Sequence, residues 1–291
     1  MKPHRKDCRG FTLPELSIAL LLGSLVVLAL LRITGLSLDT LRTRDASAAL
    51  LENLRYALAT LESELSMAGF YGLSAEGASF RFLANGNVVD AAVAVPASAQ
   101  SCGDNFAVAL AQPVQMDDGV FVLGPYRTAA CTPRGGARPG SDTLSIRRAS
   151  SEPAAAENGR LQLLVDRFDD SIRFILADAV LPATAALLPD RQQLHNLELR
   201  SYYISNDSDG QPGLPSLRVK TLTRIAGRPA FTDTEVIAGI EDMQLQIQRQ
   251  GARVRAVEVS LRARQPDGSA TSPSRTLAGS RIVALRNVPH G

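Results

Sequence analysis

The first 31 residues combine a basic start with one long apolar run. Residues 11–31 read FTLPELSIALLLGSLVVLALL and contain a single charged side chain, Glu15. At 1.5 Å per residue, an α-helix of this length crosses a hydrocarbon layer of roughly 30 Å. The basic side chains before the run predict an amino terminus held in the cytoplasm and later residues outside the inner membrane: Lys2, Arg5, Lys6 and Arg9.

Two common export signals do not fit this arrangement. An ordinary secretory signal shows a small-residue cleavage site after its apolar run. Here the run continues into Arg32, Ile33 and Thr34 without such a site. A lipoprotein signal would place its cysteine after the apolar run, whereas Cys8 lies before it. The position of these residues therefore excludes both signals.

A helical period continues beyond the apolar run. Leucines three or four residues apart form one stripe and charged residues occupy other faces: Leu50, Leu54, Leu58, Leu61 and Leu65, against Asp45, Glu52, Arg55, Glu62 and Glu64. Gly69 and Gly72 follow as stop signals. The pattern predicts a helix over 11–68, about 85 Å long, whose second half needs a sheet to cover the stripe. A coiled coil is the alternative, although the stripe lacks sustained heptads.

From Phe70 onward the period changes to two, which is typical of strands. Asn85-Gly86 lies between two short apolar runs and indicates a hairpin. A second hairpin is expected to join 199–205 to 217–225, and further strands are expected at 142–148, 243–247, 257–263 and 281–286. Segments 91–99 and 152–159 are expected as surface loops. The predicted fold class is α+β, a long amino-terminal helix packed on an antiparallel sheet.

Glu15 interrupts the apolar run close to its start. A carboxylate near membrane depth costs on the order of 2.5–3.5 kcal/mol, so such a residue suggests a function and a cationic partner. The alternative is a Glu15 that reaches the membrane interface beside the start of the helix.

Residues 9–16, RGFTLPEL, followed by the apolar run closely resemble the class III signal of type IV prepilins and pseudopilins. The resemblance implies that a prepilin peptidase cuts between Gly10 and Phe11 and N-methylates Phe11. It also implies that Glu15 supports subunit addition by neutralising the α-amine of a neighbouring subunit. Many major pilins have a helix-kinking proline just beyond the run, whereas this chain has Arg32. Local unwinding would therefore use Gly23 or Gly35.

The later sequence is similar to the PilW family of minor pilins in the order of four segments: SDTLSIRRAS (141–150), YYISNDSDGQPGLPSLRVKTL (202–222), VIAGIEDMQLQI (236–247) and VALRN (283–287). The resemblance implies a pilin-like fold in four parts. These are a leader over 1–10, a transmembrane helix over 11–31, an amphipathic stem helix over 32–68 and a β-rich periplasmic head over 69–291.

Charge and composition limit the classes of partner that the chain is expected to bind. Residues 1–10 contain four of the 31 basic side chains and one of the 29 acidic ones, so the chain after Gly10 carries a net charge near −1. That chain has no basic excess to neutralise phosphates, and the absence of tryptophan removes the best stacking side chain, so no nucleic-acid partner is expected. Lysine occurs only at Lys2, Lys6 and Lys220, which we attribute to genome composition.

Three cysteines are present, and Cys8 lies in the leader. Two cysteines in an exported domain, Cys102 and Cys131, predict one disulfide. The alternative is a pair of buried free thiols. No paired Cys or His has the spacing of a zinc site, and neither a cofactor nor a metal is expected.

No catalytic motif stands out. Neither G-x-S-x-G nor H-E-x-x-H occurs. Asn206 to Gly210 could form half of a calcium loop, but Arg218 occupies the twelfth position counted from Asp207, so a polar hairpin turn is the better interpretation. No enzymatic activity is expected.

The resemblance implies a minor pilin, a structural subunit that helps initiate or cap a type IV pilus and so contributes to cell adhesion and twitching motility. Its implied partners are the prepilin peptidase, other minor pilins, the major pilin and the inner membrane, with a tip adhesin as a further candidate. The protein would first lie in the inner membrane and then in a pilus on the cell surface. The alternatives are a GspJ-like minor pseudopilin of a type II secretion system and a membrane-anchored periplasmic enzyme or binding domain.

Overall fold

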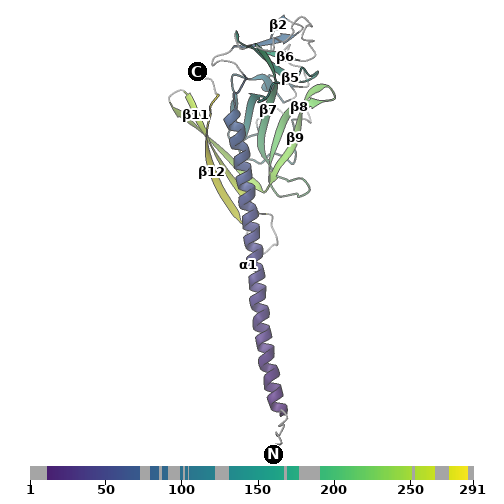
Figure 1. Cartoon of the computed structure of the whole chain (residues 1–291), viewed down its shortest axis with the longest axis vertical. Helices are drawn as coiled ribbons and strands as arrows, with labels where there is room; N and C mark the ends of the chain where they lie inside the picture. The colour runs from purple at the N-terminus through teal and green to yellow at the C-terminus, as the bar shows by residue number, and fades with distance from the viewer. Residues whose placement is uncertain are drawn as a thin grey trace, which may run out of the picture. The chain divides into compact units, whose positions relative to one another are not determined.

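The computed structural model describes residues 12–72, 79–84, 87–90, 99–100, 102–103, 105–121, 131–166, 169–176, 191–250, 253–265 and 275–287. Figure 1 shows their path. Contacts within the chain divide it into two units, Met1–Ala49 and Leu50–Gly291, and each is described by itself.

The first unit contains the beginning of α1 (Leu13–Met67), a helix of 55 residues. The stretch Leu13–Gly35 is long and apolar enough to cross a membrane, and its most apolar part buries no side chain within the chain. Gly23 and Gly35, where local unwinding was predicted, both lie inside the continuous helix. The helix ends one residue before the predicted Ala68.

The second unit contains the rest of α1 and two sheets. The strands of the larger sheet are β1 (Ser79–Ala84), β2 (Asn87–Val89), β3 (Val114–Asp117), β4 (Thr143–Ala149), β5 (Leu161–Asp166), β6 (Asp169–Leu176), β7 (Gln192–Ser205), β8 (Ser216–Ile225) and β9 (Arg228–Ala238). Their order is β2-β1-β6-β5-β7-β4-β3, and β8 pairs with both β7 and β9. A short 3-10 helix, η1 (Phe106–Val108), precedes β3. The smaller sheet has the order β10 (Ile240–Gln250), β11 (Arg253–Arg264) and β12 (Thr276–Ala284).

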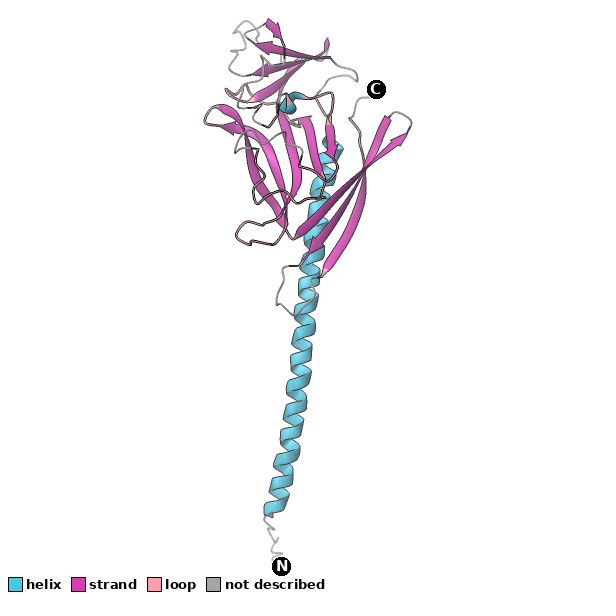
Figure 2. Cartoon of the chain, turned by 180° about the vertical axis from the view of Figure 1, so that it is seen from behind, coloured by secondary structure: helices cyan, strands magenta, loops and turns pink. Residues whose placement is uncertain are grey.

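The part of α1 that follows Leu50 packs against strands of both sheets, as Figure 2 shows from behind. All five leucines of the predicted stripe are buried there, which confirms the stripe and its need for a sheet and contradicts the coiled-coil alternative. Apolar side chains of β4, β7, β8, β10, β11 and β12 complete this first core. A second apolar cluster joins β5, β6 and the opposite face of β4 and β7 to the segments around Cys102 and Cys131.

Gly69 turns the chain away from α1 toward β4. Its φ is +75°, a conformation that costs glycine little, and its N–H donates to the carbonyl oxygen of Arg147 at 3.0 Å. A Cβ atom at this position would lie 2.3 Å from the carbonyl oxygen of Asn287. The predicted stop signal therefore also allows a close approach of two chain segments.

The α+β class is confirmed, but the prediction of a purely antiparallel sheet was wrong. β1 and β6 pair in parallel, with Ser79 opposite Ser171. Two strands so far apart in sequence can pair this way because the connection between them is long enough to cross over. The predicted hairpins β1–β2 and β7–β8 are present, with Asn85 and Gly86 outside the described residues. The strands β3, β5, β6 and β9 were not predicted.

Candidate functional site: the amino-terminal motif and the charged residues of the second unit

The bond between Gly10 and Phe11 lies just before the described part of the chain, which begins at Thr12. Leader cleavage at Gly10-Phe11 and N-methylation of Phe11 therefore stay predictions. The structure shows the residues directly after this bond. Thr12 precedes the first helical residue, Leu13, so any cut at Gly10-Phe11 would leave an α-amine one residue before the helix cap.

Glu15 folds back on the start of its own helix. Its Oε2 atom accepts hydrogen bonds from the N–H of Thr12 at 2.9 Å and from the hydroxyl of Thr12 at 2.8 Å. The carbonyl oxygen of Thr12 accepts the N–H of Leu16 at 3.1 Å, so Thr12 is the N-cap residue. Thr-x-x-Glu is the sequence signature of a capping box, in which the glutamate satisfies the N-cap N–H. This role of Glu15 was missed, although the pattern Thr12-Leu13-Pro14-Glu15 could have shown it.

The hydroxyl groups within the apolar stretch are satisfied by the helix itself. Ser17, Ser24 and Thr34 donate to carbonyl oxygens three or four residues earlier, at 2.8–3.0 Å. Such bonds remove the need for water around these side chains. Glu15 at the start and Arg32 near the end are the charged residues of Leu13–Gly35. The stretch is thus apolar along its length, as a membrane-spanning helix requires.

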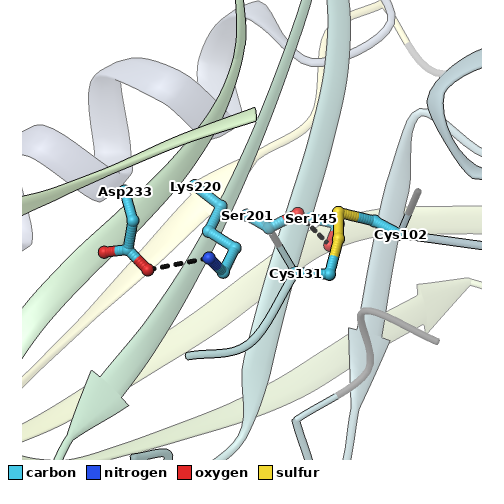
Figure 3. The surroundings of a disulfide bond; sticks show 6 residues. All are labelled: Cys102, Cys131, Ser145, Ser201, Lys220 and Asp233. Atoms are coloured by element: carbon cyan, nitrogen blue, oxygen red, sulfur yellow. Dashed lines mark hydrogen bonds and ion pairs between the residues drawn. A yellow bond between two sulfur atoms is a disulfide. The ribbon is translucent and has the colours of Figure 1, made fainter. Parts of the chain in front are cut away.

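The structure joins Cys102 and Cys131 in a disulfide, with their Cα atoms 5.1 Å apart, which is an ordinary separation for such a bond. Both side chains are buried in the second apolar cluster. Cys102 lies in a turn before η1, and Cys131 begins the segment that leads to β4. Figure 3 shows the bond and its surroundings. Whether both thiols are oxidised in the exported protein stays a prediction.

Glu64 directly precedes Leu65 of the leucine stripe, and the fold buries its side chain. It is 8% exposed and pairs with Arg200 of β7, while Arg148 of β4 lies 3.5 Å away. Glu198 approaches both arginines, at 2.5 Å from Arg148 and 3.5 Å from Arg200. Burial and the charge of Glu64 raise the pKa of Tyr202 to about 12. A leucine stripe does not reveal such a residue, because the partners come from strands far away in sequence.

Glu62 makes a second ion pair between α1 and a sheet, with Arg281 of β12. The side chains of Glu62 and Arg281 are 42% and 47% exposed, far more than that of Glu64. The two glutamates therefore connect α1 to both sheets, Glu64 through a buried pair and Glu62 through an exposed one.

Asp233 of β9 is the centre of a second group of charged residues. Its carboxylate accepts from Arg218 Nε at 2.9 Å, Lys220 Nζ at 2.9 Å and the hydroxyl of Tyr203 at 2.8 Å. Burial alone would raise the pKa of Asp233, but hydrogen bonds from Lys220, Arg218 and Tyr203 lower it below its ordinary value. Burial and the negative charge of Asp233 raise the pKa of Tyr203. Alternation along β8 would place Arg218 and Lys220 in solvent, yet both are 1% exposed.

The polar turn at Asn206 to Gly210 holds its acidic groups against the protein. Asp207 Oδ1 accepts the N–H of Gly213 at 2.7 Å, and Asp209 Oδ1 lies 3.0 Å from Arg218 Nη1. Within the described part of the chain, no group of three or more His, Cys, Asp or Glu side chains could hold a metal ion. The contacts of Asp207 and Asp209 agree with a hairpin turn.

A cavity of about 360 Å³ is lined by Arg138, Pro139, Gly140, Glu241, Asp242 and Arg262. Its charged residues contact one another: Arg262 lies 2.7 Å from Asp242 and 3.7 Å from Glu241. These pairs engage both carboxylates of the cavity with Arg262.

Comparison with known proteins adds one finding. Residues 5–31 match the model of the prokaryotic N-terminal methylation motif. The match includes Gly10, Phe11 and Glu15, and it supports a type IV pilin-like or pseudopilin-like protein. The motif indicates processing by a prepilin peptidase and assembly with pilus-type components, and the apolar helix that follows fits a membrane-anchored protein of this kind. No curated protein matches the chain, and no solved structure matches it.

Proposed function

We propose that the chain is a minor pilin, a structural subunit that helps initiate or cap a type IV pilus after cleavage by a prepilin peptidase. The observation that carries this proposal is the methylation motif at residues 5–31 directly before an apolar helix. The likeness of the later sequence to the PilW family supports a minor rather than a major subunit. Other minor pilins, the major pilin and a tip adhesin are the proposed partners.

Glu15 would serve assembly in two ways under this proposal. Within its own chain it caps α1 through Thr12. Between subunits its carboxylate would neutralise the methylated α-amine of Phe11 of a neighbouring copy or another subunit, because a charge in hydrocarbon is costly without a partner. The capping contact keeps the Glu15 carboxylate at the amino-terminal end of α1. Cleavage would create an α-amine near this end in every subunit.

A structural role also agrees with the charged residues of the second unit. Glu64 is engaged by Arg148 and Arg200, and Asp233 by Arg218 and Lys220. These pairs connect α1 to β4 and β7, and β8 to β9, so they stabilise the fold and leave these groups occupied. We therefore propose a non-enzymatic function.

Processing tests the first step of this proposal. In cells that contain a prepilin peptidase, mass spectrometry of the purified protein should find an amino terminus at Phe11 carrying one added methyl group. The same gene in a peptidase-deficient strain should yield the uncut chain. An intact Met1 in the competent strain would contradict the proposal.

Partner recovery tests the second step and separates pili from secretion systems, because the same motif occurs in both. The processed protein, cross-linked in cells and purified, should recover minor and major pilins, and it should be present in filaments sheared from the surface. Recovery of secretion-system components instead would favour a minor pseudopilin. A processed protein without any filament component would favour a membrane-anchored domain.

A further inference from the structure

One face of the larger sheet carries a row of polar side chains, three of them buried and the fourth, Asp233, half-buried. Ser145, Ser201, Lys220 and Asp233 lie opposite one another on β4, β7, β8 and β9. Directly opposed residues of antiparallel strands place their side chains on the same face. The two serine hydroxyls are 2.8 Å apart, and Lys220 Nζ lies 2.9 Å from Asp233. Figure 3 shows this row in the surroundings of the disulfide.

Charged side chains lose hydration free energy when a segment covers them, because water solvates free charges well, and their partners must offset that loss. If Lys220 were uncovered, water would solvate its ammonium group well, whereas an apolar side chain would gain nothing from exposure. A segment that covers the row therefore removes water that would solvate Lys220, Arg218 and Asp233, and this costs free energy. The cover must be held in place by contacts of its own.

One covering segment begins at Cys131 and is held mainly by polar contacts. The carbonyl oxygen of Arg134 accepts from the hydroxyl of Ser205 at 2.9 Å and lies 3.3 Å from the hydroxyl oxygen of Tyr203. The N–H of Arg134 donates to Asp233 at 3.3 Å. Most residues of 132–140 are exposed or half-buried. This segment consequently has little apolar surface that would keep it on the sheet.

The other covering segment contains Cys102 and is anchored more firmly. The buried guanidinium of Arg147 donates to the carbonyl oxygens of Phe106 at 2.9 Å and Gln112 at 2.8 Å. Val108 and Leu110 of the same segment are buried in the second apolar cluster. The disulfide thus ties a weakly held segment to a firmly held one.

We propose that the Cys102–Cys131 disulfide is a redox-dependent lock, which keeps the segment after Cys131 over the buried charged row, and that reduction opens this segment locally and exposes Lys220. Locking is a two-electron oxidation: the two thiols lose two protons and two electrons and form one S–S bond. The co-reactant is a protein or small-molecule disulfide, whose two sulfurs take up the electrons and protons as two thiols. A dithiol such as dithiothreitol reverses the reaction.

Lys220 reports on the lock without any engineered probe. It is the only lysine after Lys6, so the chain that follows Gly10 contains one lysine amine. In the oxidised protein its side chain is inaccessible and paired with Asp233. An amine-acylating reagent such as an N-hydroxysuccinimide acetate should therefore modify it slowly, and the tryptic peptide from Val219 to Arg224 shows the modification.

The experiment compares the rate of Lys220 acylation in the full-length protein before and after dithiothreitol, with hydrogen exchange measured on the same samples. We expect reduction to raise the rate by about tenfold or more, as local opening does for a protected group. The Cys102→Ser/Cys131→Ser variant should react at the fast rate without any reductant. Exchange should rise at residues 131–140 while β10 and β11 stay protected.

Glu62→Gln is the matched control, because it removes an exposed contact between α1 and β12 of the smaller sheet and leaves both cysteines in place. Its Lys220 should stay protected. Gly135→Ala opens the same segment without reduction, since a Cβ there would lie 2.3 Å from the hydroxyl oxygen of Ser205. Its Lys220 should react faster although the disulfide is intact. The proposal is overturned if reduced protein protects Lys220 as well as oxidised protein does, if Gly135→Ala leaves it protected, or if reduction releases exchange in all strands together.

Discussion

The two units of the chain use charged side chains in different ways. In the first unit, Glu15 lies at the start of an exposed apolar helix and its contacts come from Thr12, three residues away. In the second unit, Glu64 and Asp233 are covered, and their charged partners lie 13 to 136 residues away in sequence, from Lys220 beside Asp233 to Arg200 beside Glu64. The contacts of Glu15 therefore form within one helix turn, whereas those of Glu64 and Asp233 depend on the completed fold.

The largest effect should follow from removing the charge of Glu15. Glu15→Gln keeps an oxygen that can accept the N–H of Thr12 but cannot neutralise an amine. Membrane insertion and cleavage at Gly10-Phe11 should be unchanged, while recovery in sheared filaments should fall by about tenfold or more, the change that about 1.4 kcal/mol produces. The measurement is the ratio of filament protein to membrane protein in the same cells.

Two further variants sharpen this test. Thr12→Ala removes the capping hydroxyl and keeps the charge, so its filament recovery should stay close to that of the wild type. Glu15→Asp should be intermediate at best, because the shorter side chain reaches less far. Normal recovery of Glu15→Gln would show that capping suffices and that no charge pairing takes place.

The disulfide should give the largest effect on the stability of the second unit. Its cysteines are 29 residues apart, and closure of such a loop stabilises a fold by about 3–4 kcal/mol. Cys102→Ser/Cys131→Ser should lower the free energy of unfolding by that amount in urea. Cys8→Ser, a change in the leader, should have no effect. Complete alkylation of Cys102 and Cys131 in unreduced wild-type protein would disprove the bond.

The sequence predicts well those features that depend only on neighbouring residues. The leucine stripe of α1, its end near Gly69 and the strand β4 follow from local periods and from glycine. The parallel pair β1–β6 could not be predicted, because it depends on a connection across the whole intervening chain. The burial of Arg218 and Lys220 could not be predicted from the sequence of β8 either, because the groups that cover them come from other segments.

The same distinction holds for the candidate site. Gly10, Phe11 and Glu15 form a motif within six residues, so they can be recognised from sequence alone. The ion pairs of Glu64 require α1, β4 and β7 to be in place together. A helical pattern shows that a glutamate is beside the leucine stripe, but it does not show which strand will cover it.

Glu64 and Glu62 offer a direct comparison of buried and exposed pairs on one helix. Glu64→Ala leaves Arg148 and Arg200 with Glu198 as their one shared partner. We expect a loss of about 2 kcal/mol in the free energy of unfolding, below the usual cost for full burial because Glu198 remains and Arg200 is a third exposed. Glu62→Ala breaks an exposed pair with Arg281 and should cost about 0.5 kcal/mol or less. Equal losses in urea denaturation would contradict the difference in burial.

The smallest effect concerns acid stability, and it tests the charged row around Asp233. The folded-state pKa of Asp233 is lowered, so its carboxylate contributes stability that is present above its ordinary pKa of 3.8 and is lost as the pH falls through the folded value. Asp233→Asn should therefore destabilise the protein at pH 7, and this difference from the wild type should shrink below pH 4.

Asp117 should show the opposite pH dependence, because burial raises its pKa. Asp117→Asn should be neutral or slightly stabilising at pH 7, and any gain should disappear in acid. Urea denaturation at pH 7, 5 and 3 measures both variants, and a constant difference for Asp233→Asn across this range would show that its carboxylate gains nothing from Lys220 and Arg218.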